Sequence, residues 1–177
     1  MVFPENQLKS TCMKKLLLLL LFPLLGFGQH NFSIIKSNLV WEKVFPGTVT
    51  PEEMMKQIKL TGKCQYVDFN YDVLDFCISY TPDDFKRYGY RNLPDPSFLS
   101  EGGICTGMIE FKEGRYKVTV FKLECYDPVD GIVIYPVNNY ILKDGEMRDS
   151  DRYERSLSYY DQYFSYLFDK MPEGKTW

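Results

Sequence analysis

The stretch that decides the fold is Ile109–Val120, which reads I-E-F-K-E-G-R-Y-K-V-T-V. Apolar and polar residues alternate on both sides of Glu113-Gly114, the pattern of two antiparallel strands joined by a tight turn. The expected cross-strand partners are Phe111 with Tyr116 and Ile109 with Val118 on one face, and Glu110 with Lys117 on the other. Because apolar pairs and opposite-charge pairs both stabilise neighbouring strands, we predict a β-hairpin within an antiparallel sheet.

A strand and a helix precede this hairpin. Residues Val40–Phe45 are rich in β-branched and aromatic side chains and stop at Pro46-Gly47, which predicts a first strand. Thr50 then offers a capping hydroxyl, Pro51 suits the first helical position, and Thr61-Gly62 suits a helix end. We therefore expect a helix between these signals.

The segment Cys64–Tyr80 is predicted to form a second hairpin, with its turn at Asn70-Tyr71. That turn would place Cys64 opposite Cys77, within reach of a disulfide. The remaining cysteines that follow residue 28 are Cys105 and Cys125. They would pair only if a bulge interrupted the next hairpin, because its register sets Cys105 against Lys122.

Beyond the central hairpin, short strands are expected at 132–135 and 139–142, followed by an amphipathic helix over Tyr153–Lys170. The core stripe of this helix combines leucine and aromatic residues: Tyr153, Leu157, Tyr160, Phe164, Leu167 and Phe168. A second stripe, Tyr159, Tyr163 and Tyr166, lies about 115° to one side of it. Tyrosine combines large contact area with a polar tip, so we predict that these rings are partly exposed and mark a partner surface. The alternative is that they cover the sheet edge or the long loop of the same chain.

That long loop, residues 81–103, contains three prolines and shows no sustained period. It brings three cations and two tyrosines together in a short run: Lys86, Arg87, Tyr88, Tyr90 and Arg91. Arginine beside tyrosine suits stacking on a sugar, binding of a carboxylate or recognition of a protein surface. This run is therefore a candidate site; alternatively, its aromatic rings cover the sheet and its charges point to water.

The first 28 residues have the features of a secretory signal peptide. Met13-Lys14-Lys15 precedes the apolar run Leu16–Leu25, and Gly26 and Gly28 are spaced as a small-x-small cleavage site. We expect translation to start at Met13, cleavage to follow Gly28, and the mature chain to be periplasmic or extracellular without a transmembrane segment. A buried helix or a retained membrane anchor is the alternative, although the run is shorter than the ~20 residues of a spanning helix.

Removal of residues 1–28 leaves 18 of the 21 Lys and Arg and 23 of the 24 Asp and Glu, a net charge of −5. An acidic domain repels a phosphate backbone, so nucleic acid is not an expected partner. The only histidine, His30, lies next to the expected new terminus and offers no triad. The acidic residues match no calcium loop and the cysteine spacing matches no zinc site, so we expect neither a metal nor a cofactor.

Several of these stretches resemble an exported bacterial family of unknown function with a TBP-like fold, the α+β half-saddle of the TATA-binding protein. They are Met13-Lys14-Lys15, Leu39–Phe45, Thr50–Glu53, Gly107–Thr119, the aromatic C-terminal helix and Trp177. The resemblance covers nearly all of residues 29–177 and implies a single domain with the order β-α-β-β-β-β-α, its C-terminal helix packed on one face of the sheet. The cysteines depart from it, and a likeness of shape says nothing about DNA.

These observations favour a non-enzymatic binding or assembly module of the bacterial cell envelope, with an envelope protein or surface ligand as partner. Two alternatives stay open: a structural or folding-support envelope protein, and an enzyme with an unrecognised site. A ligand-sized pocket would favour small-molecule binding, whereas a flat aromatic face would favour a protein partner.

Overall fold

A computed structural model describes residues 30–91, 97–126 and 134–169. The expected signal peptide, part of the expected strand at 132–135 and the final residues lie outside these ranges. Within them, no helix combines the length and apolar character needed to cross a membrane.

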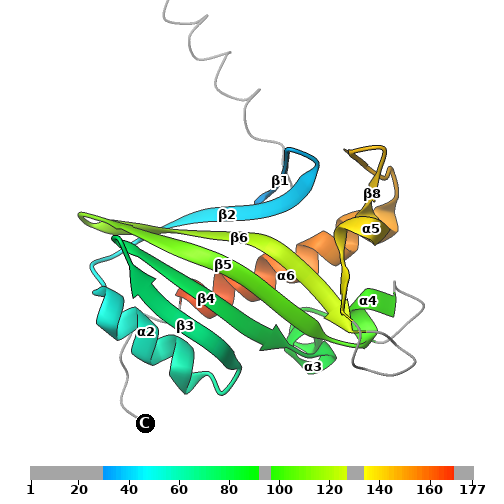
Figure 1. Cartoon of the computed structure of the whole chain (residues 1–177). Helices are drawn as coiled ribbons and strands as arrows, with labels where there is room; N and C mark the ends of the chain where they lie inside the picture. Colours follow the sequence, from blue (N-terminus) through cyan, green and yellow to red (C-terminus); the bar gives the residue numbers. More distant parts are fainter. Residues whose placement is uncertain (1–29, 92–96, 127–133, 170–177) are drawn as a thin grey trace, which may run out of the picture.

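The described chain is built on an antiparallel sheet with the strand order β1-β2-β6-β5-β4-β3 (Figure 1). A further strand, β7, pairs with β6, and β8 and β9 form a separate ribbon. The strands are β1 (Phe32–Ile35), β2 (Asn38–Pro46), β3 (Cys64–Asn70), β4 (Val73–Tyr80), β5 (Gly103–Lys112), β6 (Arg115–Tyr126), β7 (Ile134–Pro136), β8 (Leu142–Lys143) and β9 (Glu146–Met147). The helices are α2 (Pro51–Leu60), α3 (Pro82–Lys86), α4 (Ser97–Ser100), α5 (Asn138–Ile141) and α6 (Asp151–Asp169).

The predicted α+β class, antiparallel sheet and C-terminal helix are confirmed. So is the register of the central hairpin, in which Phe111 pairs with Tyr116, Ile109 with Val118 and Glu110 with Lys117. The helix after the first long strand is also confirmed: the Glu53 amide donates to Thr50 Oγ1 at 3.2 Å, and the Thr50 amide donates to Glu53 Oε2 at 2.9 Å. These two bonds satisfy amides that the first helical turn leaves without partners.

The structure differs from the sequence prediction at three places. Strand β1 is an additional strand, a short distance before the expected first strand, that the sequence analysis does not predict. Residues 138–141 form α5 rather than a strand, since the Ile141 amide donates to the Val137 carbonyl. The long loop contains α3, at whose start the Thr81 amide donates to Asp84 Oδ2 at 2.8 Å, as the Thr50 amide donates to Glu53 in α2.

One continuous core joins every described helix to the same face of the sheet. The core side chains that the helices contribute include Met54 and Ile58 of α2, Phe85 of α3, Leu99 of α4, Ile141 of α5, and Leu157 and Phe164 of α6. Figure 1 shows α6 crossing behind the sheet. Because side chains alternate along a strand, the residues between the core positions point to the opposite face. No helix in the described ranges covers that face.

The centre of α6 is attached to the edge of the sheet through Asp161. Its Oδ1 accepts a hydrogen bond from the Trp41 indole at 2.7 Å, and others from the backbone amide and side-chain amide of Asn31 at 3.1 and 2.7 Å. Trp41 is 0% exposed, and its ring packs 5.3 Å from that of Phe164. A buried indole N–H needs an acceptor, so this carboxylate determines where α6 lies along β2.

We predict that Asp161→Ala lowers the free energy of unfolding by about 1–3 kcal/mol, because it leaves the buried Trp41 N–H without an acceptor. Asp161→Asn keeps an oxygen at this position and should lose clearly less. Urea unfolding followed by tryptophan fluorescence measures both variants. Equal stability of the alanine variant and the unchanged protein would contradict this role for Asp161.

Candidate functional site

The two candidate surfaces predicted separately, the tyrosine stripe of α6 and the run at 86–91, lie against each other. The Tyr90 ring packs edge-on to Tyr159 with 5.8 Å between centroids. Further along α6, the guanidinium carbon of Arg87 lies 4.5 Å from the centroid of the Tyr166 ring. We call the region around Arg87 and Tyr166 the α3–α6 surface.

The tyrosines of the stripe differ in exposure, and the prediction that all three rings are partly exposed is wrong for Tyr163. Tyr163 is 5% exposed and packs edge-on to Phe85, with 5.6 Å between ring centroids. Tyr159 is half-buried, whereas Tyr166 is 47% exposed. The alternative, that these rings cover the long loop of the same chain, therefore holds for Tyr163, whereas Tyr159 is partly exposed and also packs on Tyr90 of that loop. Tyr166 remains as the exposed ring of the stripe.

The run at 86–91 divides in the same way. Tyr90 is buried and Tyr88 is half-buried, while Lys86, Arg87 and Arg91 are exposed. The structure thus places the aromatic rings of this run mostly inward and its cations outward, as the alternative interpretation of this run predicts.

The charges of this region are not equally available to a partner. Lys86 forms an ion pair with Asp83 at 2.6 Å, and Lys63 forms one with Asp84. Among the described residues, no carboxylate lies within ion-pair distance of Arg87. Its interaction with Tyr166 raises the pKa of the guanidinium above its ordinary value. Arg87 is therefore a fixed positive charge, held on an aromatic ring and able to receive an external carboxylate.

The cysteines do not lie where the predicted turn would place them. The turn of the β3–β4 hairpin is Tyr71-Asp72, both with positive φ, so Tyr66 and not Cys64 faces Cys77. A bulge after Cys64 sets that residue opposite Ile78. Because adjacent residues of β4 point to opposite faces, Cys64 and Cys77 lie on different sides of the sheet. The predicted pairing is wrong in register, and this turn directs Leu74 and Phe76 into the core.

The other two cysteines lie on the core side. A bulge between Thr106 and Gly107 does interrupt the central hairpin, and it sets Cys105 opposite Leu123 and Gly103 opposite Cys125. Cys105 and Cys125 are both buried, and burial raises the pKa of the Cys105 thiol far above its ordinary value. None of the four described cysteines forms a disulfide.

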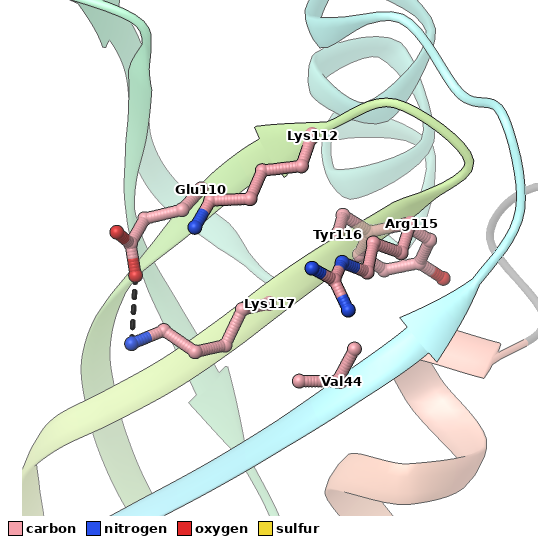
Figure 2. Close-up of a pocket in the computed structure, with 6 residues that line it drawn as sticks. All are labelled: Val44, Glu110, Lys112, Arg115, Tyr116 and Lys117. Atoms are coloured by element: carbon pink, nitrogen blue, oxygen red, sulfur yellow. Dashed lines mark ion pairs between the residues drawn. The ribbon is translucent and has the colours of Figure 1, made fainter.

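The uncovered face of the sheet carries a cleft that the sequence analysis did not identify. Its volume is about 240 Å³, and it is lined by Val44, Glu110, Lys112, Arg115, Tyr116 and Lys117 (Figure 2). Lys117 lies between two carboxylates, 2.8 Å from Glu110 and 3.3 Å from Glu42. Hydrogen bonding to Glu110 raises the pKa of Lys117 above its ordinary value. The alternation of the hairpin already indicates that Glu110 and Lys117 share one face. It does not indicate that this face lacks a covering helix, which the cleft requires.

The only histidine of the sequence, His30, lies beside an acidic residue and an aromatic ring. Its Nε2 lies 3.3 Å from Glu154 Oε2, and its ring packs edge-on to Phe32. No group of three or more histidine, cysteine or acidic side chains in the described ranges is arranged to hold a metal ion.

Comparisons with known proteins yield two solved structures of similar architecture. One is a TBP-like protein from Parabacteroides distasonis, with 13% identity, a TM-score of 0.45, and coverage of 80% of this chain and 97% of that one. The other is a DUF4468 family protein from Bacteroides ovatus, with 12% identity, a TM-score of 0.44, and coverage of 82% and 86%. No family model and no curated protein matches the chain. At this level of similarity, neither structure carries a functional conclusion for this chain.

We predict that the mature domain, residues 29–177, purified without reductant and then unfolded, titrates as four thiols. In the folded protein, Cys64 and Cys77 should react with Ellman's reagent first, because they are half-buried. Cys105 and Cys125 should react only as the protein opens, because both are buried, and the raised pKa of Cys105 reduces its thiolate further. Two titrating thiols after unfolding would instead indicate a disulfide.

Proposed function

We propose that this chain is a non-enzymatic binding or assembly domain of the bacterial cell envelope, which holds a protein partner at the α3–α6 surface. The observation that carries the proposal is the stacking of the Arg87 guanidinium on the exposed Tyr166 ring, 4.5 Å from its centroid. The partner chemistry that fits is an acidic segment offering a carboxylate to Arg87, while its apolar atoms cover the Tyr166 ring.

The residue types of this surface and their arrangement both favour contact with a protein partner. Arginine and tyrosine are enriched among the residues that contribute most to protein interfaces. Stacking also restricts the Arg87 side chain before any partner arrives, which reduces the conformational entropy lost on binding. The neighbouring cations Lys63 and Lys86 are paired within the chain, so Arg87 and the exposed Arg91 supply the positive charge of this surface.

The envelope location rests on sequence features that lie outside the described residues. Met13-Lys14-Lys15, the apolar run Leu16–Leu25 and the glycines at 26 and 28 have the order and spacing of a cleavable export signal. Export would bring the domain to the periplasm or the cell exterior, where an acidic domain meets envelope proteins and their soluble ligands.

We predict that protein recovered from a bacterium expressing the chain begins at Gln29, as cleavage after Gly28 requires. N-terminal sequencing of the protein from the periplasmic and membrane fractions tests this. Recovery of chains that retain residues 13–28 in the membrane fraction alone would favour the retained anchor and count against export of a mature domain.

The partner surface is tested with the double variant Arg87→Gln/Tyr166→Ser. Each change is at an exposed position and should alter the free energy of unfolding by less than about 0.5 kcal/mol. We expect the variant to lose at least about tenfold in affinity for a captured envelope protein, because interface residues of this kind contribute ~1–2 kcal/mol each. Affinity is measured by surface plasmon resonance with the captured partner purified.

Two matched controls accompany this experiment. Tyr71→Ser makes the same change as Tyr166→Ser at a ring that is 99% exposed in the β3–β4 turn. Lys86→Gln removes a neighbouring cation whose charge Asp83 already neutralises. Both should bind like the unchanged protein. If the double variant binds as tightly as these controls, or if no envelope protein is captured, the proposed function is wrong.

A further inference from the structure

The cleft on the uncovered face has an unusual arrangement of charge, which the proposed function does not use. Lys112 and Arg115 are directly opposite each other at the end of the β5–β6 hairpin. Like charges in such a cross-strand pair destabilise it. Lys117 follows Arg115 on the same face of β6, so three cations line one cleft at this corner of the sheet (Figure 2). We call Lys112, Arg115 and Lys117 the basic corner.

The carboxylates nearby do not neutralise the basic corner. Glu110 and Glu42 both lie within ion-pair distance of Lys117. Among the described residues, neither Lys112 nor Arg115 has a carboxylate within that distance, and both side chains are exposed. Three cations less the carboxylates of Glu110 and Glu42 leave a charge of +1, and Lys112 and Arg115 are the two cations without a carboxylate partner among the described residues. This local excess stands out in a chain whose net charge is −3.

We infer that the basic corner binds a phosphate group. A phosphate monoester carries close to two negative charges near neutral pH on one tetrahedral centre, so that one group can interact with both Lys112 and Arg115, which face each other across the hairpin. Arginine can bind two phosphate oxygens with its parallel N–H donors, and lysine adds a point charge. A dicarboxylate of the same total charge would have to divide it between separated groups.

The apolar side of the cleft fits the remainder of a phosphate ester. Val44 lines the cleft from β2 and is 53% exposed, so its methyl groups offer a surface to a carbon skeleton attached to the phosphate. The phosphate could belong to a soluble ester or to a lipid headgroup, and the basic corner would recognise both by the same chemistry. The basic corner and the α3–α6 surface lie on opposite sides of the sheet, so this inference does not depend on the proposed function.

The experiment is a titration of the ¹⁵N-labelled protein with inorganic phosphate at pH 7.5, followed by ¹H–¹⁵N NMR with the ionic strength held constant by sodium chloride. We expect saturable shifts confined to the amides of 112–117 and of Val44, with a dissociation constant of about 1 mM, because the cations are exposed. A parallel arm measures co-sedimentation with phosphatidylcholine vesicles, with and without phosphatidic acid. Binding to inorganic phosphate alone points to a soluble ester, and additional binding to the phosphatidic acid vesicles points to a headgroup.

Variants test whether the residues of the basic corner bind the phosphate group. Lys112→Gln/Arg115→Gln should abolish binding of both probes. Glu110→Gln removes the negative charge of the lining and should tighten phosphate binding by about two- to fivefold, the value of one exposed ion pair. Lys122→Gln is the control: it removes a cation from the same strand whose charge pairs with Glu124 at 2.9 Å, and it should change nothing.

Three results would overturn the inference. The first is the absence of saturable shifts at 112–117 together with no binding to phosphatidic acid vesicles. The second is unchanged binding of both probes by the Lys112→Gln/Arg115→Gln variant, shown by its NMR spectrum to be folded. The third is binding of succinate as tight as that of phosphate, which would show that the cleft does not select for a phosphate group.

Discussion

The packing of this domain depends on a single carboxylate oxygen that three donors share. Asp161 Oδ1, in the middle of α6, accepts from the buried Trp41 indole and from both amide groups of Asn31. The donors belong to β2 and to the residue that precedes β1, so the edge of the sheet and the long helix are held in one register. A rotation of α6 would break these bonds and leave a buried N–H without an acceptor, which costs more than most single contacts provide.

This constraint on α6 also decides which aromatic side chains are available to a partner. With Asp161 directed at the sheet edge, Phe164 packs on Trp41, Tyr163 turns toward Phe85, and Tyr166 lies at the surface. The capped start of α3 brings Arg87 over that last ring. A core interaction and a surface contact are therefore linked through the rotation of one helix.

The gathering of all described helices on one face has a second consequence. It leaves the other face of the sheet without a helix, so the charged side chains there interact chiefly with their cross-strand neighbours. Lys117 has two carboxylate partners among these neighbours, Glu42 and Glu110. Lys112 and Arg115 instead face each other with like charges. The α3–α6 surface and the basic corner thus arise from the same architecture, on opposite sides of it, and each can be occupied without the other.

The sequence by itself determined the elements whose causes lie within a few residues. The register of the central hairpin follows from a period of two around Glu113-Gly114, and α2 follows from the cap formed by Thr50 and Glu53. The same capping pattern at Thr81 would have predicted α3. Only the tertiary structure decided the burial of Tyr163, the separation of Cys64 from Cys77 and the opening of the cleft beside Val44. Each of these depends on which distant segments pack together, because burial is a property of the assembled layers, whereas capping and alternation are properties of neighbouring residues along the chain.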